Sequence, residues 1–498
     1  MGIVVRQSLI TTIISYAGVV IGYINLVFLY PKYLETNQVG LLRAILDSAM
    51  VLTPFASLGV PQAVARFYPR FHSDENRLSS FITLTLLISM VGFLVMTLLL
   101  KFFQDPISNF FAEEAPELLN YPGLILWLTL TLTISGIFEQ MARSKMMIAL
   151  PALLKDVVIR AFQAVLVLFY LQGTIDFDQF LFGSVGIYTL TLITLLYYLG
   201  ILRRNTFQLQ LPEKSEIKEI IVFGLITFIG LSSVIVVAKV DSLMVTGFLG
   251  LEAAAIYTTT YYMASVIEVP KRALTQSASA LLAHAFEKGD LKSASSIYRK
   301  TALHQMLIGG LLLTGIWANL ENIFDIMPKG DIYEAGAWVV MVIGCAKLMD
   351  MSFGPSSEVI GLSKHYWFNL VVIALLATFT VAANILLIPV YGMNGAAIGT
   401  LAALFLYNLA KAIFISVRIK MHPFDGRTTR VAIVIMVTVF INQLIPKVGS
   451  SLSDAIVRST LLTAVYCFAA IGLNCSDEAN QLFYDGLKRL GLDFRRRK

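Results

Sequence analysis

The chain has 498 residues, of which 57% are hydrophobic and 14% are charged, and its mean hydropathy is +0.75. These values exclude an ordinary soluble protein and predict an all-α integral membrane protein, because a helix satisfies its own backbone hydrogen bonds inside lipid. The net charge of +6 is therefore no argument for nucleic acid, and no nucleic-acid partner is expected.

Apolar stretches of spanning length follow one another along the whole chain. A helix needs about 20 apolar residues to cross ~30 Å of hydrocarbon. The first stretch is too long for a signal-peptide core and lacks a small-x-small cleavage site, so we expect it to be retained. The sequence predicts about fourteen spans, at 8–30, 39–65, 79–103, 122–142, 150–171, 178–202, 217–247, 252–283, 301–320, 335–352, 366–389, 392–417, 428–446 and 455–473.

Lys and Arg residues fall unevenly between the two sets of loops. The amino terminus and every second loop hold most of them, whereas the opposite side holds Lys32, Lys101, Lys329, Lys447 and Arg458. The positive-inside rule therefore places both termini in the cytoplasm. The loops are short, and the sequence holds no GxxxxGK[ST], HExxH or GxSxG string, so we expect no enzyme and no catalytic residue.

The longest predicted cytoplasmic connection follows the sixth span, mixes both charge signs and includes Pro212. It separates two halves that resemble each other weakly, because a shift of the chain against itself aligns Leu34 with Leu249 and Gly40 with Ala255. We therefore expect two pseudo-symmetric six-helix lobes around a central cavity, followed by two additional helices. The predicted boundaries are 1–204 for the N-lobe, 205–219 for the linker, 220–421 for the C-lobe, 422–476 for the two additional spans and 477–498 for a basic amphipathic cytoplasmic tail.

Several charged residues lie inside predicted spans. A charge near the bilayer centre costs roughly 2.5 to 3.5 kcal/mol, so such a residue normally faces a wet cavity or a partner. The candidate cavity cations are Arg43, Arg160, Lys239, Lys271 and Arg272, and the carboxylates of interest are Asp47, Asp241 and Glu268.

A second interpretation is that these charges only neutralise one another. Glu268 would then pair with Lys271 or Arg272, and the long side chains of Lys155, Lys347 with Asp350, and Lys411 would reach the cytoplasmic face as structural residues. Three further pairs have the four-residue spacing of an ion pair on one helix, namely Arg43 with Asp47, Glu139 with Arg143, and Asp156 with Arg160. Both interpretations stay open at the level of sequence.

Prolines and tyrosines add further candidates inside the spans. Pro54, Pro61 and Pro270 are candidate hinges for alternating access, or else static kinks. Tyr257, Tyr261 and Tyr262 are candidates for stacking on sugar rings, although aromatic residues near an interface also form belts. The five histidines and three cysteines are scattered, so no metal site is expected.

Three strings carry a family resemblance: LIPVYGMNGAAIG from Leu387 to Gly399, LGLEAAAIY from Leu249 to Tyr257, and ETNQVGLL from Glu35 to Leu42. They resemble the recurrent signatures of bacterial polysaccharide flippases of the multidrug/oligosaccharidyl-lipid/polysaccharide exporter superfamily. The resemblance implies a multi-pass protein of the bacterial cytoplasmic membrane. Such a protein moves an undecaprenyl-pyrophosphate-linked glycan from the inner to the outer leaflet for surface polysaccharides such as O-antigen and lipopolysaccharide.

A lipid-linked glycan would make particular demands on the predicted cavity. Its pyrophosphate needs cations in a hydrated space, for which arginine offers a fork that matches phosphate oxygens. Asp241, Glu268 and Asp47 are then candidates for coupling to H⁺ or Na⁺, and no other cofactor is expected. The expected partners are the lipid-linked glycan, membrane lipids and other membrane proteins of polysaccharide assembly.

Three alternatives remain beside this hypothesis. A lipid II flippase would carry an arginine between Tyr261 and Pro270, where Ser265 stands here. A cation-coupled drug antiporter of the same superfamily would have twelve spans and a net acidic interior. A membrane enzyme of glycan assembly would turn over a lipid-linked donor.

Overall fold

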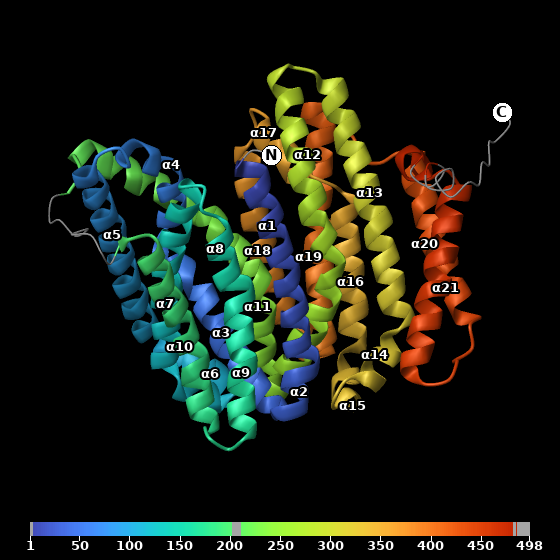
Figure 1. Cartoon of the computed structure of the whole chain (residues 1–498), viewed down its shortest axis with the longest axis horizontal. Coiled ribbons are helices and arrows are strands. Elements are labelled where there is room, and N and C mark those ends of the chain that lie inside the picture. Colours follow the sequence, from blue (N-terminus) through green and yellow to red (C-terminus); the bar gives the residue numbers. More distant parts are fainter. Residues whose placement is uncertain (1–2, 202–210, 482–484, 486–498) are drawn as a thin grey trace. The chain divides into compact units, whose positions relative to one another are not determined.

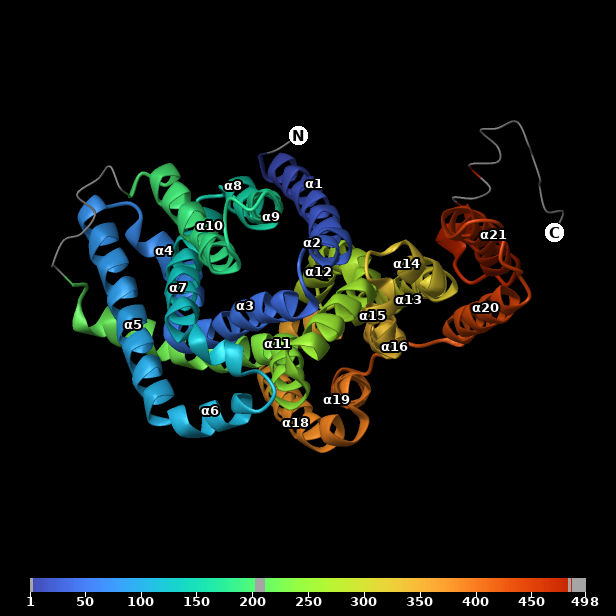
Figure 2. The same ribbon diagram turned by 90° about the horizontal axis from the view of Figure 1, so that it is seen from below.

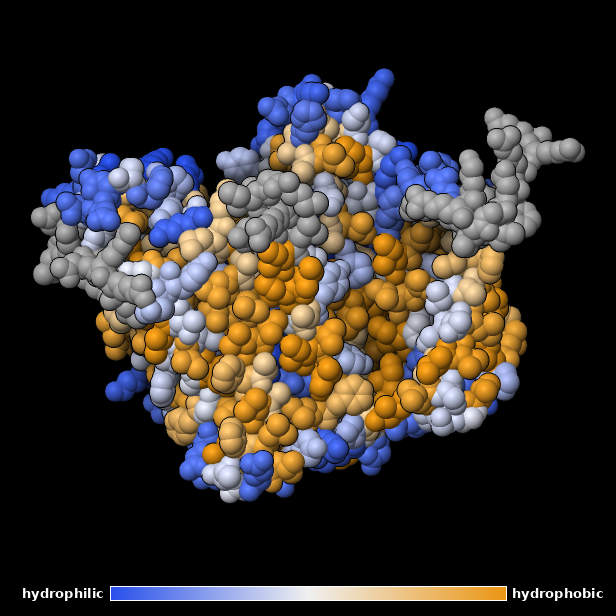
Figure 3. Space-filling model, in the orientation of Figure 1, coloured by the Kyte–Doolittle hydropathy of each residue, from blue (hydrophilic) through white to orange (hydrophobic). Residues whose placement is uncertain are grey.

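The computed structural model describes residues 3–201, 211–481 and 485, with side chains from residue 10 onward. Within these residues all regular secondary structure is helical, which confirms the predicted all-α fold. Eleven helical segments of the described chain are long and apolar enough to cross a membrane. In Figure 3 the middle stretches of the helices on the visible face are mostly apolar, shown in orange, and hydrophilic residues in blue gather toward helix ends.

The difference between eleven segments and about fourteen predicted spans arises at three places. Lys214–Glu287 is 74 residues long, too long for one crossing, and it contains the two predicted spans 217–247 and 252–283. The predicted span at 150–171 is helical, but it carries three charged residues close together, Lys155, Asp156 and Arg160. The span at 428–446 forms α20 (Gly426–Gln443), which carries polar residues at both ends.

The helices group into two compact units. Unit 1 comprises Met1–Thr259 and Thr380–Met393, and unit 2 comprises Thr260–Phe379 and Asn394–Lys498. The lobe boundaries expected from the sequence remain a prediction, since much of the 205–219 linker and of the 477–498 tail lies outside the described residues.

In unit 1, α3 (Thr36–Ser57) packs against α5 (Glu75–Phe102) and α7 (Pro122–Ser144), and α7 packs against α10 (Phe177–Tyr198) (Figures 1 and 2). Its buried core includes the aromatic residues Phe67, Phe71, Phe81 and Phe138, each at most 2% exposed, among many aliphatic side chains. The remaining helices of this unit are α1 (Ile3–Tyr23), α2 (Tyr30–Tyr33), α4 (Val60–Phe71), α6 (Gln104–Ala112), α8 (Ala149–Ala152), α9 (Ile159–Leu171) and most of α11 (Lys214–Ser265).

In unit 2, α13 (Leu291–Ala318) is the central helix, because it packs against α12 (Val269–Glu287), α16 (Ala337–Ser352) and α20. The pair α20 and α21 (Ser451–Gly472) corresponds to the two predicted additional spans and packs on α13 and α14 (Leu320–Ile326). The other elements are α15 (Gly330–Tyr333), α17 (Ser356–Leu362), most of α18 (Trp367–Tyr391) and α19 (Met393–Phe414).

Three helix breaks fall where the sequence carries glycine or proline. Gly250 has φ 88° and ψ 177° inside α11, which confirms the turn predicted between spans seven and eight. Leu58 and Gly59, both left-handed, separate α3 from α4, so Pro54 lies in the last turn before this break and Pro61 in the first turn after it. Pro270 opens α12 directly after a 3₁₀ turn at Val266–Glu268. The three candidate hinge prolines therefore flank real breaks in helix geometry.

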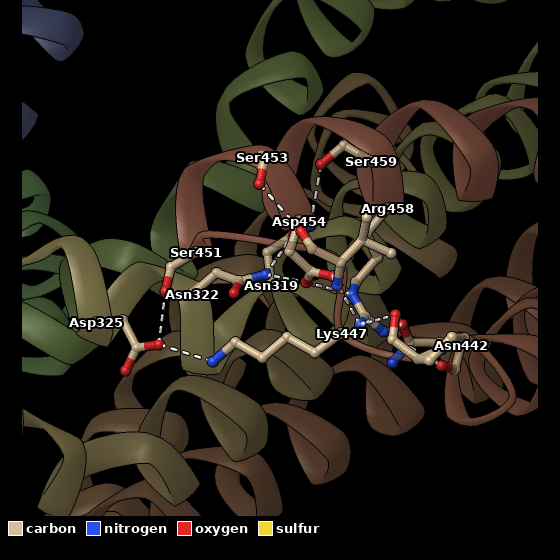
Figure 4. A network of polar contacts seen from close by, with 12 residues as sticks. Asn319, Asn322, Asp325, Asn442, Lys447, Ser451, Ser453, Asp454, Arg458 and Ser459 are labelled. Atoms are coloured by element: carbon tan, nitrogen blue, oxygen red, sulfur yellow. Dashed lines mark hydrogen bonds and ion pairs between the residues drawn. The ribbon is translucent and has the colours of Figure 1, made fainter.

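A polar cluster, here called the α14–α21 clasp, consists of Asn319, Asn322, Asp454, Arg458 and Ser459 (Figure 4). Arg458 pairs with Asp454 at 2.9 Å, and the side chains of these two residues are only 11% and 2% exposed. The Asn322 side chain donates to Asp454 at 2.6 Å, and that of Asn319 donates to Ser459 at 3.0 Å. Buried charge is tolerated here because Arg458 and Asp454 neutralise each other along α21, and Asn442 and Asn322 of other helices supply further hydrogen bonds to them.

Exposed ion pairs surround the helix ends of unit 2. Lys447 and Ser451 hydrogen-bond Asp325 at 2.9 and 2.8 Å and hold the pKa of that carboxyl below its usual value. Lys300 donates to Glu478 at 2.6 Å and lowers the pKa of Glu478 to about 2.

Candidate functional site

A cluster of charges lies inside unit 2 and is here called the charge cluster: Glu268, Lys271, Lys347, Asp350 and Lys411. Lys347 pairs with Glu268 at 2.8 Å, and Lys271 pairs with Asp350 and more distantly with Glu268, at 3.8 Å. These contacts join α12 to α16. The cluster contains three ammonium groups and two carboxylates, so its balance is one positive charge.

Polar side chains of α19 and α17 complete the cluster. Asn408 donates to Asp350 at 2.8 Å, and Lys411 donates to Ser357 at 3.1 Å. Lys411 is 4% exposed and lies 3.8 Å from the centroid of the Tyr407 ring. The expectation that Lys411 extends to the cytoplasmic face is therefore wrong, since its ammonium group is held inside unit 2 by a hydroxyl and an aromatic ring.

An open groove of about 620 Å³ runs beside the charge cluster along α12 and is here called the α12 groove. Residues at helical spacing form its wall, because positions three and four apart share one face of a helix. Lys271 and the exposed Arg272 lie at one end of the groove, which Glu268 and Glu358 also line. The polar residues Thr275, Gln276 and Ser279 continue the wall toward the apolar Ala280 and Ala283.

The α12 groove combines one guanidinium with several hydrogen-bonding side chains. In the described part of the chain, no carboxylate lies within ion-pair distance of Arg272, whereas Lys271 is held by Asp350 and Glu268. Of the two partners that the sequence suggests for Glu268, Lys271 is therefore in contact with it and Arg272 is not. Such an arrangement can bind an anion at Arg272 and donate or accept hydrogen bonds along α12.

In unit 1 the predicted cation Lys239 pairs with Asp47 at 2.7 Å, and Asp47 is almost fully buried. The pairing of Asp47 with Arg43 expected from their spacing is thus replaced by a contact between α11 and α3. Asp241 is 4% exposed and accepts hydrogen bonds from Asn384 at 2.7 Å and from Tyr257 at 3.2 Å. The two candidate coupling carboxylates therefore both make contacts with residues of α11. Asp47 pairs with a lysine, and Asp241 accepts hydrogen bonds from an amide and a phenol.

The other two candidate cations of unit 1 belong to its buried polar interior. Arg160 donates to the carbonyl of Gly18, and its own carbonyl accepts from Asn25 at 2.7 Å. Asp156 accepts from Ser15 at 2.9 Å, so the expected pairing of Asp156 with Arg160 gives way to contacts with α1. Arg43 is half-buried, and its Nε has no hydrogen-bond partner among the described residues.

The aromatic and acidic candidates also separate in the structure. Tyr257 is 1% exposed and donates to Asp241, so its ring is packed rather than presented to a sugar. Tyr261 and Tyr262 are half-buried, and Lys347 lies 5.4 Å from the centroid of the Tyr261 ring. Glu139 contacts Lys155 at 3.5 Å rather than forming the expected pair with Arg143.

Sequence reasoning missed residues that the structure brings into these sites. Lys347 and Asp350 are expected from the sequence only to reach the cytoplasmic face, whereas the structure pairs them with Glu268 and Lys271. Asn384 and Asn408 are not singled out by the sequence analysis. The signal was present, because each is a polar residue inside an apolar span, where polar side chains normally find partners on other helices. Within the described chain no group of three His, Cys, Asp or Glu residues is placed to hold a metal ion.

Comparison with known proteins gives concordant findings. Residues 4–279 match the family model described as polysaccharide biosynthesis protein. An uncharacterized membrane protein of Methanocaldococcus jannaschii is 24% identical over 456 residues, covering 84% of each chain. The chain is similar to a solved structure of the lipid II flippase MurJ in an inward closed conformation, with a TM-score of 0.74 at 13% identity over 97% of this chain and 100% of that one.

A second solved structure, an inward-facing multidrug resistance MATE family transporter of the MOP superfamily, has a TM-score of 0.63 at 14% identity and covers 84% of this chain and 99% of its own. At these identities the two structures show a shared fold, which is that of membrane transporters. Because the family model matches more than half of its residues, the chain belongs to the polysaccharide biosynthesis protein family.

Proposed function

We propose that the protein is a flippase that moves an undecaprenyl-pyrophosphate-linked oligosaccharide repeat unit from the inner to the outer leaflet by alternating access. The proposed place is the bacterial cytoplasmic membrane with both termini in the cytoplasm. Other membrane proteins of polysaccharide assembly are the proposed partners. The family and the transporter fold support this class of activity, and the α12 groove supports the kind of substrate.

The α12 groove is the observation that carries the proposal. Arg272 offers a planar fork of donors to a pyrophosphate, and Thr275, Gln276 and Ser279 offer the hydrogen bonds that sugar hydroxyls require. The positive balance of the charge cluster beside the groove favours an anion over a cation as its occupant. This property argues against a drug-cation antiporter, for which a net acidic site is expected.

Substitution of Arg272 tests this assignment. Arg272→Gln should lower the rate of flipping of a fluorescent lipid-linked oligosaccharide in proteoliposomes by about 10-fold or more, since a hydrogen bond to a charged group contributes roughly 1.5 to 3 kcal/mol. Because Arg272 is exposed and Glu268 keeps its lysine partners, the thermal midpoint of the purified protein should be unchanged.

Arg418→Gln is the matched control, since Arg418 is also exposed in unit 2 and does not line the groove. It should flip the substrate at the wild-type rate. Wild-type flipping by Arg272→Gln would exclude the groove as the pyrophosphate site. Flipping of labelled lipid II in place of the oligosaccharide by the wild-type protein would instead support the alternative substrate.

We propose in addition that a carboxylate couples flipping to an H⁺ or Na⁺ gradient, with Asp241 as the first candidate beside Asp47 and Glu268. Asp241 is 4% exposed and accepts hydrogen bonds from Asn384 and Tyr257, so its carboxylate lies in the polar interior of unit 1 rather than at the surface. Asp241→Asn should leave flipping measurable but make its rate insensitive to both gradients. Exposed Asp178→Asn is the control and should retain wild-type gradient dependence. Full gradient dependence in Asp241→Asn would remove this residue from the coupling mechanism.

A further inference from the structure

A second cavity of about 390 Å³ lies in unit 1, between α4 and the start of α11, and is here called the α4–α11 notch. Its wall from α11 changes character along the helix. Lys218 and Glu219 come first, and Val222, Phe223 and Ile226 follow on the same face, three to four residues apart. Lys218 and Ile226 are separated by about 12 Å along the helix axis. The notch therefore passes from charged to apolar residues along the axis of α11.

Arg66 of α4 covers the polar end of the notch. Its guanidinium carbon lies 4.5 Å from the centroid of the Phe223 ring and 5.5 Å from that of Phe67. Stacking on aromatic faces fixes the plane of a guanidinium group while leaving its N–H groups free to donate. Arg66 is thus an exposed and oriented donor at the mouth of an apolar pocket.

The carboxylate in the notch does not cancel this charge. Glu219 pairs with Arg70 at 2.9 Å, and the neighbouring Glu216 pairs with Arg77 at 2.6 Å. In the part of the chain that the structure describes, no carboxylate lies within ion-pair distance of Arg66 or Lys218. Two cations therefore remain to attract an anion.

The floor of the notch identifies the kind of anion. Val222 and Ile226 are 48% and 54% exposed, and they lie in the apolar stretch of α11 that crosses the membrane. A soluble phosphate would leave this apolar surface in contact with water. An acyl chain would cover it, and each Å² of apolar surface removed from water contributes about 25 cal/mol to binding. The predicted topology places this end of α11 at the cytoplasmic leaflet, where anionic lipids are concentrated.

We propose that the α4–α11 notch is a binding site for an anionic phospholipid, whose phosphate contacts Arg66 and Lys218 and whose acyl chain lies against Val222 and Ile226. The site is separate from the α12 groove, and its occupant is a membrane lipid rather than the transported substrate. A lipid held here braces α4 against α11 at the membrane surface.

Binding of a fluorescent phosphatidylglycerol to the purified full-length protein in neutral detergent micelles tests the proposal. The double variant Arg66→Gln/Lys218→Gln should bind about 25-fold more weakly, since each basic residue near an anionic lipid contributes about fivefold. Lys288→Gln/Lys292→Gln removes the same charge from the exposed α12–α13 turn and should bind as the wild type does. Phosphatidylcholine and glycerol 1-phosphate should not compete.

Each opposite result overturns the assignment. Equal losses in both double variants would mean attraction to general surface charge, and competition by glycerol 1-phosphate would mean a soluble-phosphate site. Should the Arg66 variant fail to fold, Val222→Glu places a carboxylate on the exposed floor and leaves the stacking of Arg66 on Phe223 intact. It should weaken phosphatidylglycerol binding to a similar extent, and unchanged binding would exclude the notch.

Discussion

The residues of the charge cluster make their shortest ion pairs with another helix. Lys347 and Asp350 lie three residues apart on α16, as do Glu268 and Lys271 at the start of α12, yet the shortest contacts cross from one helix to the other. Each crossed pair joins two elements, which a pair along one helix does not do. The charge cluster therefore contributes to the packing of α12 on α16 as well as to the local electrostatics.

Removal of one lysine should reveal this role. Lys347→Gln leaves Glu268 with only the 3.8 Å contact to Lys271, and should lower the free energy of unfolding. Lys347→Gln/Glu268→Gln should recover most of it, giving a coupling energy of about 0.5 to 3 kcal/mol in a double-mutant cycle of thermal or denaturant unfolding. Lys155→Gln, whose pair with Glu139 has a lysine side chain 62% exposed, is the control and should change stability little. Additive effects at residues 347 and 268 would contradict a cross-helix pair.

Sequence alone predicted which residues carry charge inside the membrane, but only part of how they pair. A spacing of four residues identifies only neighbours on one helix. It therefore predicts that Asp47 pairs with Arg43 and that Asp156 pairs with Arg160. Lys239 and Ser15 are the partners found, and both come from other helices. Tertiary packing decides between such options, and no periodicity within a single span encodes it.

At the scale of elements, helix breaks could be predicted wherever glycine or proline marks them. Gly250, Pro54 and Pro270 all lie at or beside breaks. The π-helical turns at Ile24–Leu29 and Leu153–Val158 carry no such residues and were not predicted. They follow from tertiary contacts, because Asn25 and Asp156 within them bond to the facing segment.

Gly40 provides a test of close packing between elements. A Cβ atom at this position of α3 would overlap the backbone carbonyl of Leu251, directly after the kink of α11. Gly40→Ala should therefore reduce the free energy of unfolding by about 1 to 3 kcal/mol, since a backbone carbonyl cannot move aside as a side chain can. A reduced thermal midpoint in detergent would show it.

Gly186→Ala in α10 is the control for that change. A Cβ atom there meets nothing within 4 Å, so the better helix propensity of alanine should leave stability equal or raise it by up to about 1 kcal/mol. Equal effects at the two glycines would contradict the contact between α3 and Leu251.

At the scale of the whole molecule, topology is the principal prediction. After replacement of the native cysteines, a cysteine at Glu113 or Asp176 should react with an impermeant reagent from outside, and one at Lys214 or Lys292 should react only after permeabilisation. All four positions are exposed in the structure, so a difference in labelling reports the side of the membrane and not burial. The reverse pattern would invert the predicted orientation and place the α4–α11 notch at the outer leaflet.

The α14–α21 clasp has a consequence for how the chain is made. The amide of Asn322 and its carboxylate partner Asp454 are 132 residues apart, so one is synthesised well before the other. At about 5 to 20 residues per second, roughly 7 to 26 s pass between the synthesis of Asn322 in α14 and that of Asp454 in α21. During that interval the asparagines of α14 lack their final partners, and water, lipid headgroups or an insertion chaperone must satisfy them. Ribosome pausing between α14 and α21 would lengthen this exposed stage, which makes biogenesis sensitive to translation rate in a segment remote from either candidate site.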